Sequence, residues 1–238
     1  MDESGILERM MSFGLTRLEA GIYICLFKNG ELTGYEVAKQ TGISRSNVYG
    51  GLSGLADKGA AYLIEGAANK YAAIPIEEFC DNKIRNMQKE KDFLIKNMPV
   101  MAVAEEGYIT IEGAKNIKDK ILTMLEKAKQ RIYLSAPESF IESIREELTE
   151  AVERKIKLVL ITDKDIGIRD TVQYLTEKKE KQIRLIIDSV YVLTGDVKGE
   201  KSDTCLYCGQ RNFVNVFKEA LRNEIKLIEL TEGETKDE

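Results

Sequence analysis

The chain has 238 residues, of which 43% are hydrophobic and 32% charged, and its formal net charge is −5. No apolar run approaches the roughly 20 residues that cross a bilayer, and the N-terminus lacks the basic and then apolar order of a signal peptide, so we expect a cytoplasmic protein without a membrane partner. The chain contains no histidine. This removes the usual general base and the commonest metal ligand, and we expect no catalytic residues, no metal site and no cofactor.

Three capped helices are predicted near the N-terminus, over residues 16–29, 33–42 and 44–58. Thr16 and Thr33 are each followed three residues later by a glutamate, which is the spacing of a capping box. Gly42 is placed to end the second helix in a left-handed conformation. Because a single residue separates Gly42 from Ser44, the N-cap of the third helix, the pattern predicts a helix-turn-helix.

The third helix carries three glycines, each of which costs a helix interior about 0.5–1 kcal/mol relative to alanine. On a helical wheel Gly51 shares the buried face. The opposite face is almost free of bulk, and it consists of Ser46, Tyr49, Gly50, Ser53 and Gly54. We interpret this bare face as a surface that lets the backbone approach the DNA major groove. The alternative is a weak helix held by its neighbours, in which the glycines have no function.

A hairpin and a polar helix follow. Two short strand-like runs around Gly-Ala-Ala-Asn in residues 60–74 predict a hairpin, which is the wing of the domain. Pro75 and Pro99 bracket a helix, and its apolar seam consists of Cys80, Ile84, Met87, Lys91, Leu94 and Met98. We interpret this seam as a coiled coil that joins two copies of the chain. The alternative is a linker helix that packs on its own domain.

From Gly107 onward, strands alternate with helices. Runs rich in Val, Ile and Leu predict a mostly parallel sheet that is covered on both faces. Helices are expected near residues 114–129, 138–155, 170–179 and 212–223, and a final strand over residues 225–230. The predicted fold class is a multidomain protein of the α+β and α/β type. It has a winged helix-turn-helix over residues 1–75, a helical linker over 76–106 and an α/β domain over 107–238.

The run from Leu15 to Ala61 resembles the winged helix-turn-helix of the TrmB family of transcriptional regulators, and its most specific part is SRSNVY, residues 44–49. The α/β portion resembles the phospholipase D-like half-domain that the effector domains of this family share. The resemblance implies a regulator that binds double-stranded operator DNA as a homodimer and responds to a small-molecule effector such as a sugar. The chain departs from the family at Gly50, Gly51 and Gly54, where larger or charged residues are usual.

The catalytic motif of the phospholipase D fold is H-x-K-x-x-x-x-D, in which the histidine attacks phosphorus. The best-matching stretch is KQIRLIID, which has Lys181 in place of the histidine and Ile183 in place of the lysine, and retains only Asp188. Without an imidazole the covalent step has no nucleophile. The resemblance therefore implies the fold without its chemistry.

The resemblance places the DNA-recognition motif at Ser44, Arg45, Ser46, Asn47 and Tyr49. To these we add Ser53 from the bare face and, as phosphate contacts, Lys39, Gln40 and the wing residues Asn69 and Lys70. Residues 1–75 contain seven basic and eight acidic residues, which is not the charge of a typical nucleic-acid binder. The alternative is a winged-helix module that binds proteins within a larger transcription or chromatin assembly.

A ligand pocket is expected at the carboxyl ends of the strands. The polar residues expected there are Ser135, Glu138, Asp163 and Asp188, and Gln210, Arg211 and Asn212 open the last helix. Acids, amides and hydroxyls suit a polyol or sugar, although polar loops alone would have the same composition. Cys205 and Cys208 are too few for a zinc site and point to opposite faces of a strand, so we expect them to be buried apolar side chains; a redox pair is the alternative.

Overall fold

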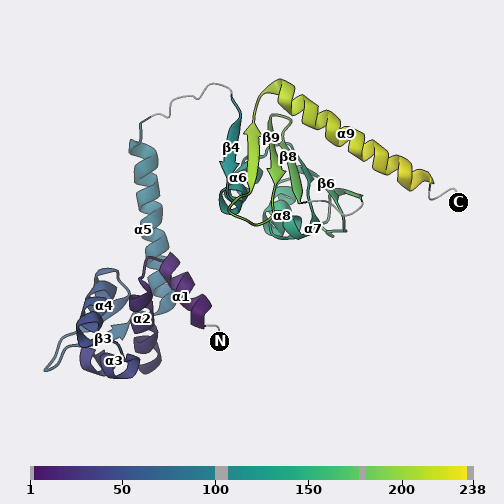
Figure 1. The fold of residues 1–238 in the computed structure, drawn as a ribbon. Coiled ribbons are helices and arrows are strands. Elements are labelled where there is room, and N and C mark those ends of the chain that lie inside the picture. Colours follow the sequence, from purple (N-terminus) through teal and green to yellow (C-terminus); the bar gives the residue numbers. More distant parts are fainter. Residues whose placement is uncertain (1–2, 100–106, 177–180, 235–238) are drawn as a thin grey trace. The chain divides into compact units, whose positions relative to one another are not determined.

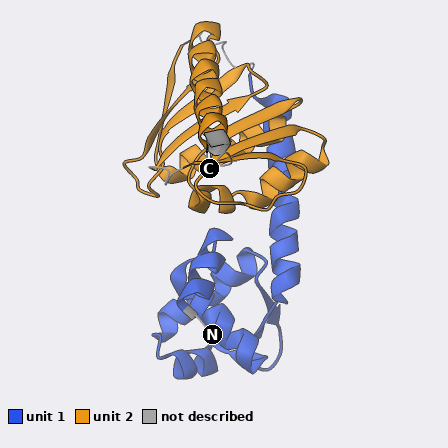
Figure 2. Cartoon of the chain, turned by 90° about the vertical axis from the view of Figure 1, so that its right-hand side faces the viewer, with its two compact units in different colours: residues 1–101 blue, residues 102–238 orange. Residues whose placement is uncertain are grey.

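The computed structural model describes residues 3–99, 107–176 and 181–234. The chain forms two compact units, residues 1–101 and residues 102–238, which are coloured separately in Figure 2 and shown with their helices and strands in Figure 1. By length and apolar character, no single helix among the described residues could cross a membrane, although the bent pair Ser4–Ser12 and Arg17–Asn29 meets those two criteria together.

The first unit begins with four helices, α1 (Glu3–Ser12), α2 (Arg17–Asn29), α3 (Gly34–Thr41) and α4 (Arg45–Asp57). The last three confirm the predicted helices, whereas α1 was not predicted. Both capping boxes are present. The side chains of Thr16 and Thr33 each accept a hydrogen bond from the backbone N–H of the third helical residue, which is a glutamate. The carboxylate of that glutamate accepts a hydrogen bond from the backbone N–H of the threonine. Gly42 ends α3 with a φ of 70°, in the left-handed region. These ends are therefore decided by interactions within a few residues.

The predicted wing is present as strands β2 (Ala61–Ile64) and β3 (Lys70–Ala73), and the short β1 (Leu32–Thr33) joins them in the order β1-β3-β2. All pairs in this sheet are antiparallel. The Tyr23 hydroxyl donates a hydrogen bond of 2.6 Å to the Ile74 carbonyl, which ties α2 to the end of the wing. The core beneath consists mainly of Ile22, Leu26, Val48, Leu52, Leu55 and Phe79.

Helix α5 (Ile76–Asn97) follows the wing. It enters the core of the first unit at Phe79, which is 1% exposed. Farther along, the predicted seam is exposed, with exposed fractions of 59% at Ile84, 72% at Met87 and 53% at Leu94. The alternative that this helix packs along its own winged-helix domain is therefore wrong for the part that begins at Ile84.

The second unit is built on a seven-stranded sheet in the order β4-β10-β9-β8-β5-β6-β7. Its strands are β4 (Ile109–Glu112), β5 (Arg131–Ser135), β6 (Lys157–Thr162), β7 (Val172–Leu175), β8 (Gln182–Ile187), β9 (Tyr191–Asp196) and β10 (Thr204–Cys208). Only the pairs β5–β6 and β6–β7 are parallel. The prediction of a mostly parallel sheet is wrong, because short turns join neighbouring strands; Asp188 and Ser189 take positive φ values of 53° and 58° in the hairpin between β8 and β9.

Helices cover both faces of this sheet, as predicted. On one face lie α6 (Ala114–Lys127), α7 (Glu138–Glu142) and α8 (Arg145–Glu153), and on the other lies α9 (Arg211–Glu234), which is labelled in Figure 1. The predicted helix over residues 138–155 is interrupted after α7, where the Ser143 hydroxyl donates to the Phe140 carbonyl at 2.7 Å.

Two predicted elements have the wrong type. Residues 172–175 form β7 rather than a helix, because pairing with the edge of β6 outweighs local propensity. Residues 225–230 continue α9 rather than forming a strand. Val214, Leu221 and Ile228 recur every seven residues and are buried together against the sheet, which stabilises the longer helix.

Candidate nucleic-acid interface and ligand cleft

Helix α4 presents the predicted recognition motif to solvent. The side chains of Ser44, Arg45, Ser46, Asn47 and Tyr49 are exposed, as is that of Ser53 one turn later. Ser44 occupies the N-cap position, but its side chain makes no capping hydrogen bond. The prediction that the Ser44 side chain caps the helix is therefore wrong.

Two aromatic contacts connect α4 to the start of α3. The guanidinium carbon of Arg45 lies 4.6 Å from the centre of the Tyr35 ring, which is a cation–π geometry. The ring of Tyr49 covers Gly34 so closely that a Cβ atom there would lie 2.6 Å from the Tyr49 Cε1 atom. Arg45 and Tyr49 are thus held by α3 while both remain exposed. Tyr35 was not predicted from the sequence, where an aromatic residue two positions after the capping Thr33 was the available signal.

The three glycines of α4 have different surroundings. A Cβ atom at Gly50 would meet nothing within 4 Å, so this position leaves the outer face bare, as predicted. At Gly51 it would lie 2.5 Å from Ile22 Cδ1, which confirms that this glycine permits close packing of α4 on α2. At Gly54 it would collide with the Glu19 carboxylate. The prediction that Gly54 belongs to the bare face is therefore wrong.

The Glu19 carboxylate explains why Gly54 lacks a side chain. It is only 6% exposed, it accepts a hydrogen bond of 2.6 Å from the backbone N–H of Thr16, and it forms a 2.6 Å ion pair with Lys58 at the end of α4. Burial acts to raise the pKa of Glu19, but the hydrogen bonds from Lys58 and Thr16 outweigh it and lower the pKa below the ordinary value of 4.5. One buried carboxylate therefore joins the start of α2 to the end of α4.

The four predicted phosphate contacts differ in their availability. Lys39 on α3 and Asn69 in the wing turn are exposed. Gln40 accepts a hydrogen bond of 3.3 Å from the Cys25 thiol, and Lys70 lies 3.8 Å from the Glu31 carboxylate. Gln40 and Lys70 therefore already take part in contacts within their own domain.

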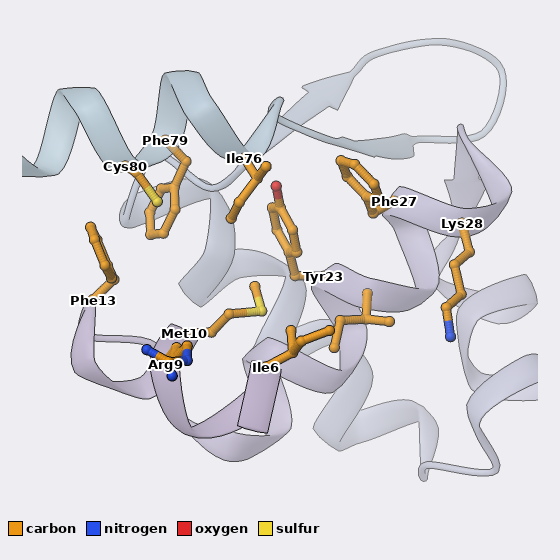
Figure 3. Close-up of a pocket in the computed structure, with 11 residues that line it drawn as sticks. Ile6, Arg9, Met10, Phe13, Tyr23, Phe27, Lys28, Ile76, Phe79 and Cys80 are labelled. Atoms are coloured by element: carbon orange, nitrogen blue, oxygen red, sulfur yellow. The ribbon is translucent and has the colours of Figure 1, made fainter. Parts of the chain in front are cut away.

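An apolar hollow of about 380 Å³ lies between α1, α2 and the start of α5 (Figure 3). Its lining is aromatic and aliphatic, with basic groups at Arg9 and Lys28; the apolar members are Ile6, Met10, Phe13, Ile24, Phe27, Ile76 and Phe79, with Cys80 beside them. Phe27 is 57% exposed. Cys80 belongs both to this hollow and to the seam of α5.

The residues predicted to surround an effector fall into two groups in the second unit. Ser135 ends β5, and Glu138 and Asp163 follow β5 and β6 at the edge of the sheet where these two strands end. Asp163 accepts a hydrogen bond of 2.8 Å from the backbone N–H of Glu138, which lowers the pKa of Asp163. Ser135 is only 2% exposed.

The second group lies at the opposite edge, because β8 and β10 run antiparallel to their neighbours. Asp188 accepts three backbone hydrogen bonds of 2.8–2.9 Å from residues 129–131. Burial acts to raise the pKa of Asp188, and these bonds outweigh it and lower the pKa. Gln210, Arg211 and Asn212 follow β10 at this same edge. The prediction of one pocket made by all seven residues is therefore wrong.

A basic cleft of about 410 Å³ lies at this second edge, between the sheet and α9. Its basic side chains are Arg131, Lys157, Lys218, Arg222 and Lys226, and the single acid in its lining is Glu229. This cleft was not predicted from the sequence. The signal was present in α9, where three basic residues recur every fourth position and so lie on one helix face.

The C-x-x-C cysteines are buried and unpaired, which agrees with apolar side chains. Burial raises the pKa of Cys205 to about 12. Within the described ranges, no group of three or more His, Cys, Asp or Glu side chains is placed to hold a metal ion.

Two family models match the chain in the order of its units. The model described as sugar-specific transcriptional regulator TrmB matches residues 10–77, and the model described as transcriptional regulator TrmB, EBD N-terminal subdomain, matches residues 107–202. The chain belongs to the TrmB family. This confirms the resemblance seen in the SRSNVY segment.

Curated relatives of this TrmB-family chain include proteins from Bacillus subtilis and Pyrococcus furiosus. An uncharacterized protein, YrhO from Bacillus subtilis, is 27% identical over 169 residues, which is 69% of this chain and 61% of the relative. The HTH-type sugar sensing transcriptional regulator TrmBL1 from Pyrococcus furiosus is 29% identical over 150 residues, which is 61% of this chain and 44% of the relative. The matched segments thus span less than two-thirds of either relative.

Solved structures similar to the TrmB-family chain include TrmBL2, an archaeal chromatin protein with a novel mode of DNA binding. It is 21% identical, with a TM-score of 0.43, over 94% of this chain and 98% of TrmBL2. NucT from Helicobacter pylori is 11% identical, with a TM-score of 0.44, over 52% of this chain and 98% of NucT.

Proposed function

We propose that this TrmB-family chain is a cytoplasmic, homodimeric transcriptional regulator that binds operator DNA through α4 and senses a small molecule through its α/β unit. The observation that carries the proposal is the exposed face at the start of α4. Arg45, Asn47 and Tyr49 are all exposed there, and a Cβ atom at Gly50 would meet nothing within 4 Å. Short polar side chains on a helix that can approach closely suit the major groove.

The DNA proposal is tested by fluorescence anisotropy titration of the full chain against DNA fragments from the region upstream of its own gene, at several salt concentrations. Arg45→Ala and Asn47→Ala should each weaken binding roughly 5- to 150-fold, since a specific base contact is worth about 1–3 kcal/mol. Arg17→Ala removes an exposed charge from α2 outside the recognition face and serves as the control. If both variants bind DNA with the affinity of the parent, the proposal is contradicted.

A protein-interaction module is the second candidate, and the near balance of seven basic and eight acidic residues in residues 1–75 favours it. The same Arg45 and Asn47 variants distinguish the two. Under this second function, DNA retention stays unchanged while a protein partner is lost from affinity purification.

The homodimer is supported by the apolar surface of the first unit, for which we propose a second copy of the chain as the occupant. The seam of α5 exposes Ile84, Met87 and Leu94, and its first residue, Cys80, lines the hollow in Figure 3. Apolar residues at heptad spacing on an exposed helix are typical of a two-helix seam. Met87→Glu should shift the chain to a monomer by sedimentation, whereas Gln88→Glu on the same helix should not; a dimer that persists in Met87→Glu contradicts this role.

We propose a sensing rather than a catalytic role for the α/β unit. The chain has no histidine to attack phosphorus. The Asp188 carboxylate, which is the one retained motif residue, already accepts three backbone hydrogen bonds. Hydrolysis of a phosphodiester that is abolished by Asp188→Asn in a correctly folded protein would contradict this assignment.

A further inference from the structure

The basic cleft of the second unit gathers positive charge from three elements that are far apart in the sequence. Arg131 begins β5, Lys157 begins β6, and the two are direct partners in the parallel register. Like charges placed opposite one another on neighbouring strands are destabilising. Lys218, Arg222 and Lys226 face them from α9.

Local acids offset only part of this charge: Asp188 interacts electrostatically with Arg131, and Glu229 is the one acid against five basic residues in the lining. The carboxylate of Glu224 on α9 forms a 3.1 Å ion pair with Arg184. Glu229, the acid in the lining, accepts a hydrogen bond of 3.2 Å from the Tyr174 hydroxyl. Among the described residues, no ion pair forms with Lys157, Lys218, Arg222 or Lys226. A cleft with this imbalance concentrates anions from solvent.

The remaining lining suits the uncharged part of a small molecule. Tyr133, Tyr174 and Ser189 carry hydroxyl groups, and Val159 and Val172 supply apolar surface. The volume of about 410 Å³ lies within the roughly 300–1,000 Å³ of small-molecule sites.

We propose that this cleft binds a small phosphate monoester, with the phosphate held by Arg222, Lys218 and Lys157 and a hydroxylated body facing Tyr133 and Ser189. The regulatory consequence of this binding rests on the proposed function, whereas the binding itself does not. The planar guanidinium of Arg222 suits bidentate contact with phosphate oxygens, and the lysines add point charges.

The test is calorimetric titration of the full chain with glucose 6-phosphate, glycerol 3-phosphate and fructose 1,6-bisphosphate, with glucose and inorganic phosphate as controls. At least one ester should bind, glucose should not, and inorganic phosphate should bind at least tenfold more weakly than the best ester. The double variant Lys218→Glu, Arg222→Glu should weaken that binding at least tenfold. Lys115→Glu, which reverses an exposed charge on α6, should leave it unchanged.

A second measurement does not depend on the choice of ester. Lys157→Gln removes one of two facing like charges, so it should raise the melting temperature of the free chain and reduce the stabilisation given by the best ester. The proposal is overturned if no ester binds, if the double variant binds as tightly as the parent, or if a non-operator DNA duplex displaces the ester through the same residues. DNA binding and ester binding are separate readouts: the effect of Arg45→Ala on DNA binding tests the proposed function alone and does not bear on the binding of the ester.

Discussion

Gly50 and Gly51 are neighbours on α4, and exchanging each for alanine should change the free energy of unfolding in opposite directions. Alanine favours the helix over glycine by about 0.5–1 kcal/mol at either position. At Gly50 the new methyl group meets nothing within 4 Å, so the full gain is expected. The two variants make the same substitution at adjacent positions in the middle of the same helix.

At Gly51 the same methyl group enters the contact between α4 and α2. It would lie 2.5 Å from Ile22 Cδ1 and 2.8 Å from Leu18 Cδ2, and overpacking of this kind typically costs about 1–3 kcal/mol. After the gain in helix propensity is subtracted, a net loss of up to about 2.5 kcal/mol remains. The helix term is common to both variants and cancels in their comparison.

Urea unfolding of the full chain, followed by circular dichroism, measures both variants, and anisotropy measures their DNA affinity. Gly50→Ala should be more stable than the parent and yet bind DNA more weakly, because the methyl group stands where the backbone approaches the groove. Equal stability of the two variants would refute the packing argument. Parent-like DNA affinity in Gly50→Ala would refute close approach at that position.

Three other outcomes follow from the surroundings of Glu19, Asp188 and Cys80. Because the pKa of Glu19 is lowered in the fold, its contribution to stability is present above its unfolded pKa and is lost as the pH falls through the folded pKa, so Glu19→Gln should flatten the dependence of the urea midpoint below about pH 4.5. Asp188→Asn keeps the left-handed turn but weakens three backbone hydrogen bonds, and it should destabilise the second unit by about 1–2 kcal/mol in thermal unfolding. Cys80 is half-buried whereas the other three cysteines are buried, and it lies in the apolar surface for which a second copy is proposed, so its thiol should react with an aromatic disulfide reagent faster in Met87→Glu than in the parent, and Cys80→Ser should remove that phase.

Local signals predicted the first unit well. The capping boxes at Thr16 and Thr33, and the left-handed Gly42, involve groups within a few residues of one another, so the sequence states them directly. The helical wheel also placed Gly51 correctly. It misplaced Gly54, whose constraint is the carboxylate of Glu19, a residue on another helix.

The sequence by itself determined where most helices and strands begin and end, the family, and the exposed start of α4, because these depend on periodicity and on neighbours along the chain. Only the tertiary structure decided the strand directions, the separation of Asp163 from Asp188, and the basic cleft. Arg131, Lys157 and Arg222 lie on three elements that meet only after the sheet has paired and α9 has packed on it. Charge carried by separate elements becomes a site through folding alone, since no local pattern records which elements will face one another.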